Sequence, residues 1–218
     1  MIAAEEPEAH LHPNAQRTLY NQLASMENQV IVSTHSPYLI SMADFSQLRA
    51  LYKKDAKVYC YQLDKHLERN EKYELRRGMV RTNSELFFSK VILLAEGVTE
   101  EQVLPALLQN YFSKNCSALG VNCVGINGKS YAPYIKLAVS FGVPVCIISD
   151  NDGNTEQEIK SHINKVKKDY SIDLNADIFE LKFLDKDNDF EAELLKMGLR
   201  DEVIEALILT CQGAENNP

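Results

Sequence analysis

The chain has 218 residues, of which 45% are hydrophobic and 25% are charged, and its formal net charge is −8. This composition is typical of a soluble protein that builds one large domain or two small ones. The negative charge argues against wrapping nucleic acid by bulk attraction, although it leaves room for a locally basic groove and suits a site for divalent cations.

The cysteines and the apolar runs indicate where the chain resides. Five cysteines, odd in number and without a C-x-x-C pair, lie mostly among apolar neighbours: Cys60, Cys116, Cys123, Cys146 and Cys211. Reduced, buried thiols fit this pattern better than disulfides, which points to the cytoplasm. Apolar runs fall short of the roughly 20 residues that a membrane helix needs, and the first residues do not form a signal peptide. We therefore expect neither export nor a membrane anchor.

Strand, helix and strand are expected in the first 37 residues. An apolar stub ends at Glu5 and Glu6. Residues 14–26 then place Leu19, Leu23 and Met26 at helical spacing, with Pro13 near the first turn, where its missing N–H is harmless. Residues 29–33 form a second, β-branched strand, and His35 follows it.

These motifs resemble the second half of an ABC-type ATPase head. Glu5 and Glu6 match the Walker B acids, the Pro-Glu-Ala-His-Leu-His-Pro run matches the loop after them, and His35 in Ser-Thr-His-Ser-Pro matches the switch histidine. The resemblance implies that these three side chains bind ATP and Mg²⁺. Glu5 stands where the family usually has aspartate. The alternative for His35 is a structural role at the exit of a strand.

The phosphate-binding loop and the signature motif of such an ATPase should lie upstream. Residues 123–130 imitate a phosphate loop, but Cys123 takes the place of its first glycine. We expect a truncated ATPase lobe that does not hydrolyse ATP by itself. The spacing of His10 and His12 also suits a metal pair, but no third ligand is recognisable, so an ordinary loop is favoured.

Between residues 42 and 86, the sequence patterns that predict helices and strands are weaker. Residues 58–63 predict a strand, and residues 64–77 are charged and lack clear periodicity. We interpret them as a late ATPase strand followed by a linker. This stretch is the most basic of the chain, and a solvated linker is favoured over a nucleic-acid contact for Arg69, Arg76, Arg77 and Arg81. The predicted boundary divides residues 1–85 from residues 86–218.

The second part alternates buried strands and helices. Residues 91–95 are uncharged and precede Glu96 and Gly97, and residues 143–149 likewise precede Asp150 and Asp152. Between them lie a helix after Glu100, with Pro105 in its early turns, a strand at 121–124 and a helix at 131–141. Because the carboxyl ends of parallel strands meet at one edge of a sheet, the two acidic exits should converge there.

Glu96-Gly97 and Asp150-x-Asp152 resemble the Toprim domain of topoisomerases, primases and certain nucleases. With Glu100 four residues after Glu96, and an ABC-like lobe in front, the chain resembles the OLD (overcoming lysogenisation defect) family of ATP-linked nucleases. The resemblance implies an α/β fold, a Toprim domain with a mostly parallel sheet flanked by helices, preceded by a partial ABC-ATPase lobe.

Phosphodiester cleavage explains why such a site gathers acids. Two Mg²⁺ or Mn²⁺ ions, which bind carboxylate oxygens, activate water and stabilise the leaving oxygen. Predicted metal ligands are Glu96, Glu100, Asp150 and Asp152, and the resemblance adds Glu191, with Asp185, Asp187 and Asp189 as competitors. The acidic run at 185–191 lacks the glycine and terminal glutamate of an EF-hand. The alternative is that Glu96 and Asp150 cap helices and Asp152 forms a turn.

The leading hypothesis is a metal-dependent DNA endonuclease with Glu96, Asp150 and Asp152 as catalytic residues. The resemblance also implies an ATP-binding, homo-oligomeric full-length protein in anti-phage defence. It further implies a catalytic lysine beyond the last metal-site acid, and Lys196 does not stand in such a segment. The alternative is a weakly active or inactive fragment that serves as an ATPase accessory or assembly module. A topoisomerase or primase lacks support, because no suitable tyrosine context or zinc ribbon is present.

Overall fold

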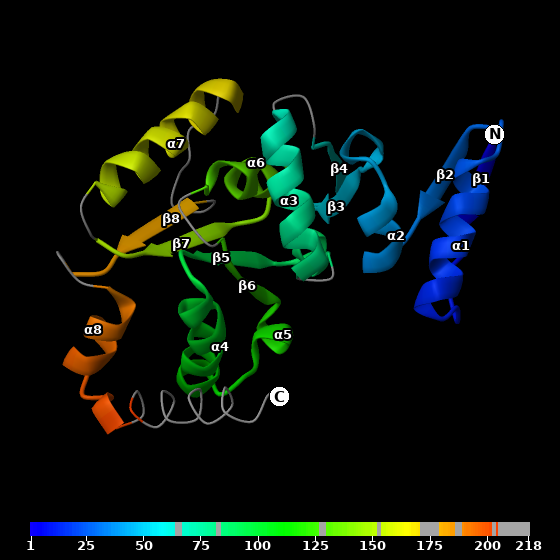
Figure 1. The fold of residues 1–218 in the computed structure, drawn as a ribbon. Helices are drawn as coiled ribbons and strands as arrows, with labels where there is room; N and C mark the ends of the chain where they lie inside the picture. Colours follow the sequence, from blue (N-terminus) through cyan, green and yellow to red (C-terminus); the bar gives the residue numbers. More distant parts are fainter. Residues whose placement is uncertain are drawn as a thin grey trace, which may run out of the picture.

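The computed structural model describes residues 1–63, 67–81, 84–126, 130–151, 154–170, 179–185, 189–201 and 204. It is a mixed α/β structure in which a four-stranded parallel sheet carries helices on both faces, as Figure 1 shows. A smaller strand–helix–strand unit at the amino terminus projects from one side of it. Within the described residues, helices are too short or too polar to cross a membrane.

The amino-terminal unit follows the predicted order. Strand β1 (Ile2–Glu5) pairs in parallel with β2 (Val30–Ser33), and helix α1 (Pro13–Ala24) connects them. Pro13 occupies the first helical turn, where no intrahelical N–H bond is lost. The apolar face predicted for this helix contains no buried residue.

Helix α2 (Pro37–Met42) and the short 3-10 helix η1 (Phe45–Gln47) follow, and then a two-stranded hairpin. Its strands are β3 (Ala50–Lys54) and β4 (Lys57–Tyr61), which pair antiparallel. Only the second of them was predicted. Asp55 and Ala56 both have positive φ values (49° and 59°), which is the geometry of a tight hairpin turn.

Helix α3 (Arg69–Arg81) lies where the sequence predicts a solvated linker, and that prediction is wrong for these residues. Leu75 is fully buried in the main core. The guanidinium of Arg76 donates to the carbonyl oxygens of Ser41 (3.2 Å) and Ala43 (3.1 Å), and it lies 4.9 Å above the ring of Phe45. Arg76 therefore has a structural role, because it donates hydrogen bonds to carbonyl oxygens at the end of α2.

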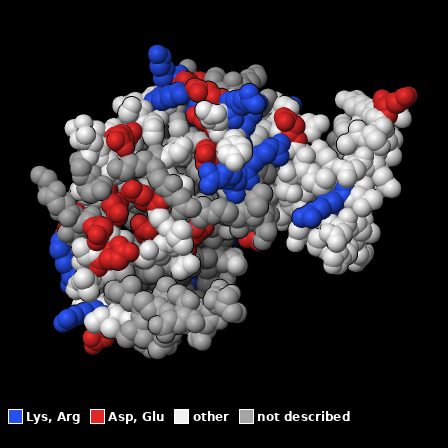
Figure 2. All heavy atoms as spheres, viewed as in Figure 1, with Lys and Arg blue, Asp and Glu red and all other residues white. Residues whose placement is uncertain are grey.

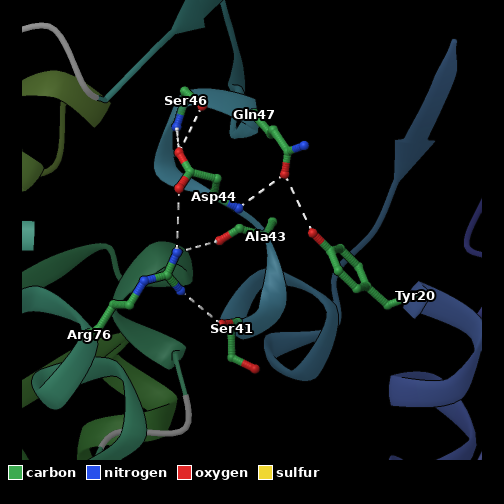
Figure 3. A network of polar contacts seen from close by, with 7 residues as sticks. All are labelled: Tyr20, Ser41, Ala43, Asp44, Ser46, Gln47 and Arg76. Carbon is green, nitrogen blue, oxygen red and sulfur yellow. Dashed lines mark hydrogen bonds and ion pairs between the residues drawn. The ribbon is translucent and has the colours of Figure 1, made fainter. Parts of the chain in front are cut away.

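Figure 3 shows that this contact belongs to a wider polar network. The Asp44 carboxylate lies 3.8 Å from the Arg76 guanidinium, and the Asp44 backbone N–H donates to the Gln47 side chain (3.0 Å). The Tyr20 hydroxyl of α1 donates to the same Gln47 oxygen (3.4 Å). Through these residues α3 is linked to α1 and α2.

A buried ion triad joins α3 to two helices that pack on one face of the sheet. The Lys136 ammonium lies 2.9 Å from the Glu71 carboxylate of α3 and 3.1 Å from the Asp169 carboxylate. Lys136 belongs to α6 (Ala132–Phe141) and Asp169 to α7 (Thr155–Tyr170), and the lysine is 0% exposed. A buried charge is tolerated when paired in this way.

The parallel sheet has the strand order β6-β5-β7-β8. The connecting elements confirm the predicted alternation of strand, helix and strand. Bounds of the elements after α3 are η2 (Glu85–Phe88), β5 (Val91–Ala95), α4 (Val98–Phe112), α5 (Cys116–Leu119), β6 (Val121–Gly125), β7 (Val145–Ser149), β8 (Phe179–Phe183) and α8 (Phe190–Lys196), with α6 and α7 as above. Helix α4 begins before Glu100, so Pro105 lies in its interior and not in its early turns as predicted.

The central strand β5 is apolar because it is buried on both faces. Ile92 and Leu94 point into a large core with α3, α6 and α7, whereas Leu93 and Ala95 point into a smaller core with α4 and α8. Figure 1 shows these two helical layers on opposite sides of the sheet. The double burial holds the end of β5 in place, and Glu96 directly follows that end.

Candidate functional site

The exits of β5 and β7 lie next to each other. The strands pair in parallel, with Ile92 opposite Val145 and Leu94 opposite Ile147. Glu96 and Asp150 each follow directly after one of these strands. The Ser149 hydroxyl donates to the Glu96 Oε2 atom at 3.2 Å, which bridges the two exits. The predicted convergence of the exits is therefore present in the sheet.

Glu100 turns back toward the same place from the first turn of α4. Its side chain is 6% exposed. A Cβ atom built on Gly97 would lie 2.8 Å from the Glu100 Oε2 atom, so the glycine leaves room for this carboxylate. Within the described residues, the Glu100 carboxylate has neither a hydrogen bond nor an ion pair. A negative charge at a helix amino terminus is favourable, and a buried carboxylate of this kind suits a cation.

Gly125, at the end of β6, packs against the same turn. A Cβ atom at this position would lie 2.4 Å from the Gly97 carbonyl oxygen and 2.9 Å from the Glu101 Oε2 atom. Backbone atoms cannot yield as a flexible side chain does, so only glycine fits here. The close approach keeps the loop with Glu96 against the neighbouring strand.

Tyr131 precedes α6 and is 0% exposed. Burial raises the pKa of its hydroxyl far above the ordinary value, and the charges of Glu96, Glu100 and Asp150 raise it further, while the Ser149 hydroxyl opposes them. The phenol therefore stays protonated and lies beside the acidic group. Sequence reasoning missed both Tyr131 and Ser149. Only Ser149 carried a signal, because it directly precedes Asp150.

The remaining predicted ligands are placed less closely. Asp152 and Asp187 lie outside the described residues. Glu191 is exposed in the first turn of α8. Asp189 caps that helix by accepting from the Ala192 N–H (2.7 Å), and Asp185 lies 3.4 Å from the Lys196 ammonium.

Glu96, Glu100 and Asp150 offer carboxylate oxygens, which are the donor type that a hard divalent cation prefers. In the part of the chain that the structure describes, no three histidine, cysteine or acidic side chains form a ready metal cluster. Figure 2 shows acidic side chains gathered where β7 and β8 end, and basic ones nearer the middle of the same view, around α3. The acidic face suits a cation better than a bare phosphate.

A second group of predicted residues meets at the exits of β1 and β2. Glu5 pairs with Ser33 in the strand register. The His35 backbone N–H donates to the Glu6 Oε2 atom (3.2 Å), and the His35 Nε2 atom lies 3.8 Å from Glu6 Oε1. The His35 side chain is 87% exposed. His12 caps α1 through its Nδ1 atom, which accepts from the Asn14 N–H (3.4 Å).

Family models match both groups of residues. Residues 87–152 match the family "Overcoming lysogenization defect protein-like, TOPRIM domain". This chain carries the TOPRIM domain of the OLD-like family. Residues 4–41 match the family "AAA domain, putative AbiEii toxin, Type IV TA system". The chain therefore contains an OLD-like TOPRIM domain preceded by a partial AAA-like region, as the resemblance implied.

Individual relatives agree with the family models. The chain is 30% identical over 162 residues to the OLD nuclease of Thermus scotoductus, an alignment that covers 69% of this chain and 30% of that protein. It is 25% identical over 242 aligned positions to the endonuclease GajA of Bacillus cereus, covering 98% of this chain and 34% of that protein. The C-terminal region of the Xanthomonas campestris pv. campestris OLD protein superimposes with a TM-score of 0.44 and 24% identity, covering 56% of this chain and 61% of that one. The chain thus spans about a third of the length of these curated relatives.

Proposed function

We propose that the OLD-like TOPRIM domain is a metal-dependent endonuclease that cleaves phosphodiester bonds of DNA. The observation that carries the proposal is the bridged pair of acidic strand exits, where Ser149 joins the exit of β7 to Glu96. The names of the relatives, a nuclease and an endonuclease, support the same reaction class. Glu96, Asp150 and Asp152 are the proposed catalytic residues.

Mg²⁺ or Mn²⁺ would supply the Lewis acidity and the activated water of a two-metal hydrolysis. The chain's own acids would hold the ions: Glu96, Glu100, Asp150 and Asp152, with Glu191 as a further ligand. The Ser149 hydroxyl donates to the Glu96 Oε2 atom and so orients this carboxylate. The rigid, doubly buried β5 keeps these groups in register.

The wider proposals concern the full-length protein. We propose that residues 1–85 belong to an ABC-type ATPase lobe, in which Glu5, Glu6 and His35 bind ATP and Mg²⁺ together with further ATPase elements, and that residues 86–218 form the nuclease domain. The hydrogen bond from the His35 backbone N–H to the Glu6 carboxylate supports this grouping. A cytoplasmic homo-oligomer acting against phage is the proposed context.

Nicking of supercoiled plasmid by this chain with Mn²⁺ or Mg²⁺ tests the reaction. We expect metal-dependent conversion to the open-circular form, abolished by chelation and strongly reduced in Glu96→Ala and Asp150→Ala. Each variant should first be shown to be folded by circular dichroism. Equal nicking by wild type and by both variants would refute the assignment of these acids.

The other candidate is a module that binds no metal and serves ATPase assembly. One observation favours it, namely that the described residues do not form a ready cluster of three metal ligands. Thermal melting separates the candidates, because a cation at 100 times its dissociation constant adds about 2.7 kcal/mol to stability. A melting temperature that does not change with Mn²⁺ supports the assembly module.

A further inference from the structure

A buried carboxylate lies next to the group formed by Glu5, Glu6 and His35. Glu8 stands two positions after Glu6 in the loop that follows β1, and it is 5% exposed. Its Oε1 atom accepts a hydrogen bond from the Thr34 hydroxyl, whereas its buried Oε2 atom has no hydrogen-bond partner in the part of the chain that the structure describes. Among these residues it has no ion pair either. A buried carboxylate without a basic partner costs stability, so its presence needs a physical reason.

The partner of Glu8 belongs to the loop that carries His35. Thr34 directly precedes His35, and its Oγ1 atom also accepts from the Ser36 backbone N–H (2.9 Å). Ser36 in turn is the amino-terminal cap of α2, where its hydroxyl oxygen accepts from two backbone N–H groups of the helix. The contact between Glu8 and Thr34 therefore holds the backbone on both sides of His35.

Glu6 holds the residue in the middle of this loop. Its Oε2 atom accepts from the His35 backbone N–H (3.2 Å). Glu6 has a φ of 42°, in the left-handed region that residues other than glycine rarely adopt. Such a conformation persists only where the surrounding contacts hold it. Two acids of one loop thus contact two consecutive residues of the other, Glu8 through Thr34 and Glu6 through His35.

The His35 side chain itself has little support from packing. Its ring lies 6.1 Å from the ring of Phe88, yet the side chain is 87% exposed. The place of the imidazole is therefore set mainly by the backbone to which it is attached. That backbone is held by the contacts of Glu6 and Glu8.

We propose that Glu8 is a positioning residue of the nucleotide site, which holds the His35 backbone through the Thr34 hydroxyl so that the imidazole meets the γ-phosphate of ATP. The inference rests on the proposed function, because it assigns a support to one of the three residues proposed to bind ATP and Mg²⁺. A carboxylate suits this role because an ionised carboxylate only accepts hydrogen bonds. Thr34 must then donate its proton to Glu8, and its lone pairs stay available for the Ser36 N–H.

Hydrogen exchange of the His35 backbone N–H in this chain, followed by NMR, tests the positioning role. This N–H donates to Glu6, so neither Glu8→Ala nor Thr34→Val removes its acceptor. Each variant should speed the exchange about tenfold, which is the effect of losing one hydrogen bond to a charged group. Thr34→Ser keeps the hydroxyl and should exchange as wild type does. The double variant should exchange no faster than either single one, because both changes break the same bond.

Ser46→Ala is the matched control. The Ser46 hydroxyl donates to the Asp44 carboxylate (2.7 Å), which is a contact of the same kind beyond the end of α2. Its loss should leave the exchange of the His35 N–H unchanged. Exchange that stays at the wild-type rate in Glu8→Ala and Thr34→Val would overturn the inference, and so would equal acceleration in Ser46→Ala.

Nucleotide titrations of the full-length protein with Mg²⁺ give a measurement that a purely structural role would not move. Thr34→Val should weaken binding of the non-hydrolysable imido analogue of ATP about tenfold relative to ADP, because a displaced His35 no longer meets the γ-phosphate. Partial unfolding, in contrast, would lower binding of both nucleotides alike. An unchanged ratio of the two affinities, in a protein whose wild type prefers the ATP analogue, overturns the role of Glu8. Wild type that binds neither nucleotide overturns the ATPase proposal for residues 1–85 and this inference with it, and leaves the endonuclease proposal untouched.

Discussion

Replacing Lys136 with methionine removes the cation from the buried triad while keeping most of its apolar stem. The change leaves the carboxylates of Glu71 and Asp169, whose side chains are 12% and 28% exposed, facing one another without their shared ammonium. Removing one partner of a buried ion pair costs about 3–5 kcal/mol. Since both acids keep some contact with water, we expect the lower end, about 3 kcal/mol.

At about 2–4 °C per kcal/mol for a chain of this size, Lys136→Met should lower the melting temperature by about 6–12 °C. Differential scanning fluorimetry at pH 7 measures this loss. Adding Glu71→Gln and Asp169→Asn should recover part of the loss at pH 7.

Lys165→Met is the control. The Lys165 ammonium of α7 lies 2.8 Å from the carboxylate of Glu68, the residue that directly precedes α3. Both of these side chains are about half exposed or more, so the variant should melt almost as wild type does. If Lys136→Met remained within 2 °C of wild type, or lost no more stability than Lys165→Met, the reasoning about the buried triad would be refuted.

Four further outcomes are expected. Gly125→Ala should lower the midpoint of urea unfolding by the equivalent of about 1–3 kcal/mol, because its Cβ would meet the Gly97 carbonyl oxygen at 2.4 Å; an unchanged midpoint would contradict the close approach. Asp189→Ala should cost about 1 kcal/mol as a lost helix cap but leave the Mn²⁺-induced shift in melting temperature intact, whereas a lost shift would make Asp189 a metal ligand. Arg76→Lys should speed amide hydrogen exchange in α2, because lysine cannot donate to both carbonyl groups and stack on a ring; exchange equal to wild type would count against that role. Iodoacetamide at pH 8 should modify the exposed Cys60 before Cys123. Burial raises the pKa of the Cys123 thiol to about 12, so almost no reactive thiolate is present at pH 8. Equal labelling of the two cysteines in mass spectrometry would contradict the burial of Cys123.

The arrangement of α3 connects the two parts of the chain physically. Arg76 holds it to the end of α2, and Glu71 holds it to Lys136 of α6. The chain before α2 carries His35, and α6 begins beside Tyr131. Movement of α2 relative to the sheet would therefore disturb the contacts of α3.

Much of the candidate site was predictable because its signals are local. A run of buried, uncharged residues that ends in Glu96-Gly97, and another that ends in Asp150, predicted two parallel strands with acidic exits. The motif Glu96-x-x-x-Glu100 likewise indicated the family from a few adjacent residues. Such patterns can be recognised in the sequence because strand and turn preferences depend on residues that are close together along the chain.

Other features were decided only by the tertiary structure. Residues 64–77 show no clear periodicity, yet residues 69–81 form α3. Leu75 of this helix is buried in the core, and Glu71 and Arg76 have partners more than 30 residues away along the chain. Tyr131 joins the acidic group because the sheet order places β5 between β6 and β7, a fact that composition and spacing do not state. The sequence by itself determined which acids stand at the strand exits, whereas the packing of distant segments determined which hydroxyls, glycines and buried charges hold them there.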